Sequence, residues 1–213
     1  MPGPALAELI RPCRTALLLQ EVQDGVVGEE AVLPELAATA AEAGLVPNAA
    51  RLAVAAREAG VRVIHAISQD VPDGFGVNRN ARLFATCRKA CAGNGSGAPV
   101  RPAPEVFADG DLVLSRYHGL SPMADGQLDA LLRNTGITSI VVTGVSLNVA
   151  IPNLVFDAVN RSYQVVVPAD AVAGTPPGFG DEILAHSIAL VATLATTDDL
   201  VEAWYCASRQ VGA

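Results

Sequence analysis

The segment SIVVTGVSLNVAIPNLVFDAVNR, Ser139 to Arg161, decides the fold that we expect for this chain. Its apolar run Ile140–Val142 predicts a buried strand, and Thr143–Ser146, with its glycine, predicts a sharp turn. A helix should follow, because apolar residues recur at helical spacing: Val149, Ile151, Leu154, Val155, Ala158 and Val159. Pro152 falls in the first helical turn, where its missing N–H has no intrahelical partner to lose. Such a unit directs the helix N-terminus at one point that suits a nucleophile, an oxyanion or an acidic ligand, yet no nucleophile stands there.

Length and composition indicate a single domain, residues 1–213, of a soluble cytoplasmic protein. Hydrophobic residues make up 51% of the chain, but no apolar run approaches the roughly 20 residues that span a bilayer. The N-terminal residues lack a basic region before an apolar block and so do not resemble a secretory signal. The net charge of -8 argues against nucleic acid as a partner. Cys87 and Cys91 have no second ligand pair nearby, so we expect reduced thiols, no metal site and no cofactor.

Predicted strands and helices alternate along the chain. We expect strands at Thr15–Gln20, Val61–Ile67, Asp111–Arg116, Ile140–Val142, Tyr163–Val167 and, as a short edge strand, Leu194–Thr196. We expect helices at Leu33–Gly60 (in two pieces broken around Gly44 and Pro47), near Asn80–Ala90 within an irregular segment, and at Asp125–Asn134, Asp181–Ala192 and Asp198–Ser208, the last capped by Thr197 or Asp198. This alternation predicts an α/β fold with three α/β/α layers, Rossmann-like, around a mainly parallel sheet of about six strands.

In a parallel sheet of this kind, ligands bind at the carboxyl ends of the strands. The segments expected there are Glu21, the loop after His65, Arg116–Met123 and the turn Gly144–Ala150. The candidate site therefore has Glu21 and Arg116 as its expected catalytic residues. Its expected pocket consists of His65, Tyr117, His118, Gly144, Val145, Ser146 and Ala150.

Three stretches resemble motifs of the isochorismatase-like hydrolases, which include nicotinamidases, carbamoyl-amide hydrolases and isochorismatases. Residues 16–27, ALLLQEVQDGVV, resemble the first-strand motif A-L-L-x-I-D-M-Q-x-D-F. Residues 119–159 resemble the segment around S-A-F-x-G-T-x-L that is followed by T-G-V-x-T-x-x-C-V, and residues 163–174, YQVVVPADAVAG, resemble the next strand with its terminal Asp. The resemblance spans nearly the whole chain and implies the fold of that superfamily.

Family members that cleave amides use an Asp, a Lys and a Cys, and the resemblance places other residues at all three positions. Glu21 stands at the Asp position, Ala150 at the Cys position, and Arg116 or Tyr117 at the Lys position. Lys89 is the only lysine, and it lies in the irregular segment. Because an alanine has no lone pair to donate, Ala150 excludes the cysteine mechanism.

The resemblance also covers the metal-dependent nicotinamidases and the isochorismatases of the family. Nicotinamidases of the family bind a metal through an Asp and two His, but the matching segment SQDVPDGFG, residues 68–76, has no His pair. Isochorismatases of the family lack the Cys, because cleaving a vinyl ether needs protonation of a carbon and then water, with no acyl-enzyme. Glu21, after a buried strand, would serve as that acid if burial raises its pKa. The turn Gly144–Ser146 resembles the place where the family carries a non-proline cis peptide.

Several of these residues also have a structural interpretation. Glu21 is either a general acid or a carboxylate paired with Arg116, and Arg116 either binds a substrate carboxylate or is that partner. His65 either faces the cleft from the strand end or packs within the sheet. Asn148 is expected to be a helix cap or a first-turn residue.

Two functional hypotheses follow. The first is a hydrolase without cysteine chemistry that uses Glu21 to cleave a small molecule, an anionic, isochorismate-like one among the candidates. The second is a catalytically degenerate member, a pseudoenzyme, that binds a small ligand or serves as an assembly subunit. Both imply a small-molecule partner and neither nucleic acid nor membrane. Ala/Val-rich helices and Trp204-Tyr205 suggest a buried contact surface, and hence a homo-oligomer.

Overall fold

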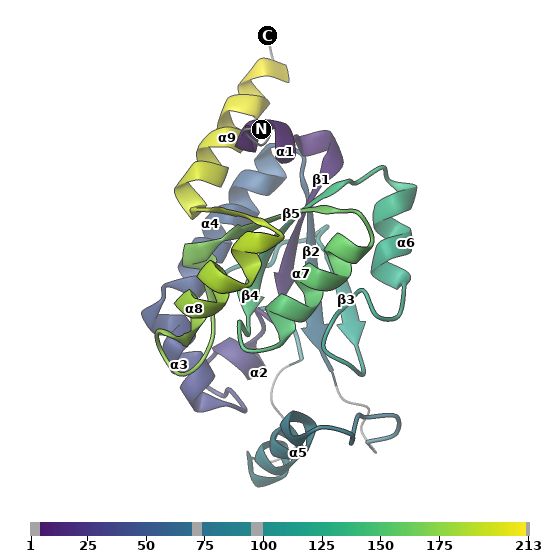
Figure 1. The fold of residues 1–213 in the computed structure, drawn as a ribbon, viewed down its shortest axis with the longest axis vertical. Helices are drawn as coiled ribbons and strands as arrows, with labels where there is room; N and C mark the ends of the chain where they lie inside the picture. Colours follow the sequence, from purple (N-terminus) through teal and green to yellow (C-terminus); the bar gives the residue numbers. More distant parts are fainter. Residues whose placement is uncertain (1–4, 70–73, 95–99, 212–213) are drawn as a thin grey trace.

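The computed structural model of the chain describes residues 5–69, 74–94 and 100–211, and it shows a parallel sheet between two layers of helices (Figure 1). The strands run in the order β3-β2-β1-β4-β5-β7, and β6 pairs with β4. Their bounds are β1 Thr15–Gln20, β2 Arg62–Ser68, β3 Leu112–Arg116, β4 Ser139–Val145, β5 Gln164–Pro168, β6 Val172–Ala173 and β7 Thr193–Ala195. All of these strand pairs are parallel, which confirms the expected α/β architecture.

The helices that the structure describes cover both faces of this sheet, apart from α5 (Figure 1). Their bounds are α1 Leu6–Leu9, α2 Asp24–Val27, α3 Pro34–Glu42, α4 Leu45–Glu58, α5 Arg82–Asn94, α6 Gln127–Asn134, α7 Ala150–Asn160, α8 Phe179–His186 and α9 Thr197–Val211. Short 3-10 turns occur at Pro12–Arg14, Ala169–Ala171 and Ile188–Leu190. No helix within the described residues is long and apolar enough to cross a membrane.

The central strand β1 separates two hydrophobic cores. Leu17 and Leu19 join the core that contains residues of α3, α4 and α9, whereas Ala16 and Leu18 join the core built with α6, α7 and α8. All six residues of β1 are buried, because both faces of the strand are covered. This double coverage explains why β1 reads as an uninterrupted apolar run in the sequence until Gln20.

Most expected elements are present, with differences at their ends. The long helical segment breaks at Gly44, whose φ is 64°, as expected. Strand β4 continues to Val145 through residues expected to form a turn, because Gly144 pairs with both β1 and β6. The helix expected to run to Ala192 ends at His186, and a 3-10 turn follows.

The cap of α9 is Thr196 rather than Thr197 or Asp198. The Thr196 hydroxyl donates to Asp199 Oδ2 (2.7 Å) and accepts the Asp199 N–H (3.2 Å), which forms a reciprocal cap. Thr197 instead donates through its backbone N–H and its hydroxyl to Asp170 Oδ1, at 2.8 and 3.0 Å. The segment between β5 and α9 is therefore fixed at the start of the last helix.

Trp204 belongs to the core of this chain and does not form an exposed contact surface. Its side chain is buried, and its indole N–H donates to the Ile10 carbonyl at 3.0 Å. Only Tyr205 of the expected pair is exposed. Trp204 therefore cannot contribute to the contact surface that the sequence suggested, and a homo-oligomer stays a prediction.

Candidate active site

Glu21 is the first residue after β1, at the carboxyl edge of the sheet. Its backbone adopts a left-handed conformation with φ of 55°, which is uncommon for a residue with a side chain. Its N–H still donates to the Ala66 carbonyl of β2, at 2.9 Å. The chain therefore leaves the sheet in a fixed direction directly after Gln20, and non-glycine residues held in this region of φ are often found at functional sites.

Arg116, the last residue of β3, pairs with Glu21 across the end of β2. Its Nη2 donates to Glu21 Oε1, and its Nη1 donates to the carbonyls of Gly119 and His118. The exposed fractions of the two side chains are only 9% for Arg116 and 17% for Glu21. The expected pairing is therefore present. Since Tyr117 is 47% exposed, Arg116 is the residue that stands opposite Glu21.

The proton affinity of Glu21 is set by opposing effects. Burial raises the pKa of the Glu21 carboxyl above its ordinary value, whereas the Arg116 guanidinium and the Gln20 amide oppose that rise by stabilising the carboxylate. The net effect is an upward shift of the pKa. The upward shift makes the Glu21 carboxyl a better proton acceptor than an ordinary glutamate, and the fixed cation beside it stabilises the form that has lost its proton.

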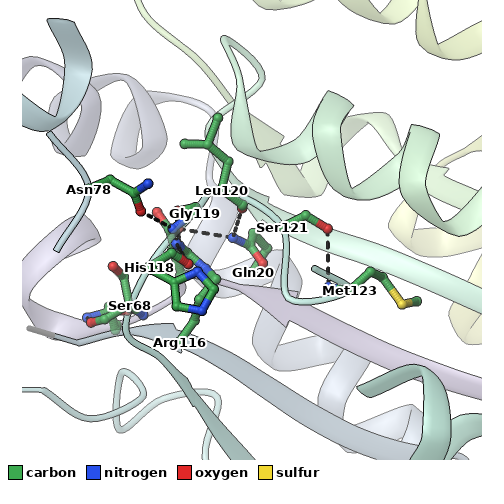
Figure 2. A network of polar contacts seen from close by, with 11 residues as sticks. Gln20, Ser68, Asn78, Arg116, His118, Gly119, Leu120, Ser121 and Met123 are labelled. Carbon is green, nitrogen blue, oxygen red and sulfur yellow. Dashed lines mark hydrogen bonds and ion pairs between the residues drawn. The ribbon is translucent and has the colours of Figure 1, made fainter. Parts of the chain in front are cut away.

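Gln20 is a site residue that the sequence reasoning missed. Its side chain is fully buried, and its Nε2 donates to Glu21 Oε1 at 3.0 Å and to the Leu120 carbonyl at 3.4 Å. Figure 2 shows Gln20 beside Leu120 within this polar network. The available signal was the position itself, since an amide ends an otherwise apolar buried strand next to the candidate acid.

The loop after β3 is held in place from several sides (Figure 2). The Gly119 carbonyl accepts a hydrogen bond from Arg116 Nη1, and the Gly119 N–H donates to Asn78 Oδ1 at 2.6 Å. Ser121 Oγ accepts the Met123 N–H at 3.2 Å. His118 is exposed and contributes its carbonyl rather than its ring to the contact with Arg116. This loop thus places two backbone carbonyls, those of His118 and Gly119, where they accept hydrogen bonds from the Arg116 guanidinium.

The turn after β4 brings the start of α7 to the same edge of the sheet. A Cβ added at Gly144 would lie 2.0 Å from the Gln20 carbonyl oxygen, so β1 and β4 approach closely only with glycine there. The Val145–Ser146 peptide bond is cis, as the resemblance implied. The Ser146 carbonyl accepts the N–H groups of Val149 and Ile151, at 3.2 and 3.0 Å. Ala150 is the buried first residue of α7.

Asn148 is not a cap of α7. Its Nδ2 donates to the Thr175 carbonyl, and its Oδ1 accepts the Thr175 N–H at 2.9 Å. The expectation of a capping role was therefore wrong. Asn148 instead joins the turn before α7 to the segment after β6, because an Asn side chain can pair with a backbone N–H and C=O together.

His65 lies inside β2 and packs within the sheet, which supports the structural interpretation over a place in the pocket. Its Nε2 lies 2.9 Å from Asp111 Oδ2, and its ring makes an edge contact with Phe107. Burial lowers the pKa of His65, while Asp111 opposes this shift. Arg57 donates to both oxygens of the Asp111 carboxylate, to Oδ1 at 3.0 Å and to Oδ2 at 2.6 Å, so this network fixes the segment before β3.

The metal site of the nicotinamidases has no counterpart within the described residues, where no group of three His, Cys, Asp or Glu could hold an ion. Residues 70–73 of the matching segment lie outside the described residues. The residues that the structure brings together at the strand ends are therefore Gln20, Glu21 and Arg116, beside the Gly119 carbonyl.

Comparisons with known proteins identify the family and the fold of the chain. A family model for the Isochorismatase domain matches residues 15–199. The chain is 29% identical over 211 residues to the ureidoacrylate amidohydrolase of Serratia proteamaculans, an alignment that covers 88% of this chain and 81% of that protein.

Solved structures show the same fold. A cysteine hydrolase from Pseudomonas syringae is 22% identical with a TM-score of 0.79, and the alignment covers 97% of this chain and 100% of that chain. An isochorismatase family protein from Burkholderia thailandensis is 26% identical with a TM-score of 0.70, covering 92% and 97%. Because the domain model covers most of the chain, from β1 into α9, the chain belongs to the isochorismatase family.

Proposed function

We propose that this protein hydrolyses a small molecule without a covalent enzyme intermediate, with Glu21 as its acid–base group. The observation that supports this most directly is the pair formed by the largely buried Glu21 carboxyl group and Arg116 at the strand ends, while Ala150 stands where a cysteine nucleophile would be needed. Chemistry that needs no nucleophilic side chain fits such a site, because water supplies the attacking oxygen.

Cleavage of an enol ether illustrates the chemistry. The protonated Glu21 carboxyl gives its proton to the terminal carbon of the C=C bond, and the ether carbon becomes an oxocarbenium ion. Water adds to that carbon, and its proton passes to the Glu21 carboxylate. The resulting hemiketal then collapses to a ketone and an alcohol. Glu21 ends the cycle protonated, as it began, so one water is consumed and no other reactant is needed.

Arg116 supports this cycle as a fixed cation. A guanidinium does not release its proton at neutral pH, so Arg116 cannot act as a proton donor in the manner of a lysine. Its bonds to Gly119 and His118 carbonyls hold the guanidinium in place. From there it stabilises the Glu21 carboxylate that forms after proton transfer, and it limits how high the pKa of that carboxyl rises.

A second candidate function is ligand binding without turnover. It is favoured by the way in which Arg116 already uses its terminal nitrogens on Glu21 and on two loop carbonyls. A guanidinium whose two terminal nitrogens already donate within the protein has fewer hydrogen bonds to offer a substrate carboxylate, although its Nε has no partner among the described residues. In this case the Glu21–Arg116 pair would stabilise the strand ends and the loop after β3.

The test compares hydrolysis of isochorismate and of ureidoacrylate by the wild type, by Glu21→Gln and by iodoacetamide-treated protein. We expect hydrolysis of one of the two by the wild type, a loss of about 10²–10⁴-fold in Glu21→Gln, and full activity after alkylation. Complete inactivation by iodoacetamide that substrate prevents would overturn the proposal. Binding of either compound by calorimetry, with no turnover, would favour the second candidate.

A further inference from the structure

The orientation of the Gln20 amide is determined by its neighbours. Both atoms that face its nitrogen, Glu21 Oε1 at 3.0 Å and the Leu120 carbonyl oxygen at 3.4 Å, are acceptors. A flipped amide would place its own oxygen against these two oxygens, so the NH₂ group must point toward them.

This orientation leaves the Gln20 oxygen without a partner. Gln20 Oε1 is buried and has no hydrogen-bond donor among the described residues. A buried acceptor without a partner destabilises the folded state, because it loses its hydrogen bonds to water on folding and gains none within the protein. An apolar side chain of similar size would avoid this loss, as the apolar residues at the preceding positions of β1 do.

We infer that Gln20 is a positioning residue, which holds the Glu21 carboxylate and the Leu120 carbonyl in the arrangement that the reaction requires, at the expense of stability. This inference rests on the proposed function, because Gln20 acts through Glu21. The Gln20 NH₂ group and Arg116 Nη2 both donate to Glu21 Oε1, so two hydrogen bonds fix the position of this oxygen. The other contact connects that arrangement to the loop after β3.

Gln23 provides a matched control three residues away. It is also buried, but its Nε2 donates to the Ser68 carbonyl at 3.0 Å and its Oε1 accepts the Ser68 N–H at 2.7 Å. Both ends of this amide are therefore satisfied by the end of β2. Gln23 has the role of a structural glutamine, whereas Gln20 has one end on Glu21 and one end unpaired.

The experiment compares Gln20→Met with Gln23→Met, because methionine keeps the length of the side chain and removes its amide. Gln23→Met should lower Tm, by about 2–4 °C for each kcal/mol lost in a domain of this size. Gln20→Met should leave Tm unchanged or raise it. The carboxyl pKa of Glu21, followed by NMR with ¹³C-labelled Glu, should rise in Gln20→Met and stay as in the wild type in Gln23→Met.

A measurement on the wild-type protein tests the same contact without relying on a variant that folds. The side-chain ¹⁵N signal of Gln20 should shift with pH along the titration of Glu21, whereas that of Gln23 should not. A Gln20 signal that ignores this titration would overturn the inference. So would a drop in Tm for Gln20→Met equal to that of Gln23→Met together with an unchanged pKa of Glu21.

Turnover separates this inference from the proposed function. If the wild type hydrolyses its substrate, Gln20→Met should lower kcat more than it raises KM, and the alkaline limb of the pH profile, where the Glu21 acid loses its proton, should move to higher pH. If the wild type hydrolyses nothing, the proposed function fails, while the NMR and Tm results still decide whether Gln20 holds Glu21.

Discussion

Arg116 and Glu21 meet over the end of β2, the strand that separates theirs, and each is the nearest opposite charge to the other in this part of the site. The pair links the first and third strands of the chain at their carboxyl ends. Removing either partner would leave the other charge poorly solvated, because both side chains are largely buried. Stability and site chemistry are therefore coupled in these two residues.

Arg116→Met should lower the free energy of unfolding at pH 7 by about 3 kcal/mol, since it leaves the Glu21 carboxylate buried without a cation. The folded-state pKa of Glu21 would rise further above its unfolded value. Stability contributed by this group would then fall as pH rises through that window, so the deficit should shrink toward pH 4.5. Urea unfolding at pH 4.5 and 7 measures this. Arg51→Met, in an exposed pair with Asp198, is the control and should change little; an equal loss in both variants would contradict the prediction.

His65→Gln should flatten the dependence of stability on pH between 7 and 5. Because burial lowers the pKa of His65, the unfolded chain takes up a proton below about pH 6.5 that the folded protein does not. Stability from this group is therefore lost as pH falls through that window, and glutamine removes the titration while keeping a donor for Asp111. Unfolding free energies at unit pH steps test this. His186→Gln, at an exposed position, should keep the wild-type slope.

Ala150→Cys alone should not create an efficient amidase. The thiol would sit at the N-terminus of α7, which lowers its pKa, but a thiolate is only part of amide hydrolysis. The proton on the leaving group would still depend on Glu21 and on Arg116, which stays charged. Glu21→Asp, Arg116→Lys and Ala150→Cys together should be measurably faster on ureidoacrylate, at matched folding. Robust turnover by the single variant would show that Glu21 and its surroundings already suffice.

Gly144→Ala should prevent stable folding or cost more than about 3 kcal/mol, since its Cβ would overlap the Gln20 carbonyl and its φ of 118° disfavours a side chain. Gly110→Ala is the matched control. Gly110 has a φ of 96°, and an added Cβ there meets nothing within 4 Å, so only the conformational cost of about 1 kcal/mol applies. Chemical denaturation of both variants gives the comparison, and equal losses would mean that β1 and β4 can separate at this point.

The sheet and most helices could be predicted because their signals are local and periodic. Strand β1 is a buried apolar run, and the break at Gly44 needs a residue that tolerates a positive φ. The Glu21–Arg116 pair could also be predicted, since both residues end strands of one parallel sheet and carry opposite charges. These inferences need only the position of each residue within its own element.

The remaining features depend on partners that are distant in sequence. Asn148 is of a residue type that often caps helices. Here, however, its amide forms hydrogen bonds with both the carbonyl and the N–H of Thr175. His65 is buried beside Asp111, a partner that follows 46 positions later. Gln20 contacts Glu21, its neighbour in sequence, but it also contacts the Leu120 carbonyl, 100 positions later, which the loop after β3 brings to it. Contacts between residues so far apart in the sequence leave no periodic pattern from which they could be predicted.

Ile10 is translated long before Trp204, yet in the folded domain the Trp204 indole N–H donates to the Ile10 carbonyl. Leu200 and Trp204 complete the core that Leu17 and Leu19 begin. While synthesis proceeds, that face of the sheet has no α9 to cover it and exposes apolar side chains to solvent or to a chaperone. This face can therefore close only after α9 has left the exit tunnel, long after Glu21 and Arg116 have been translated.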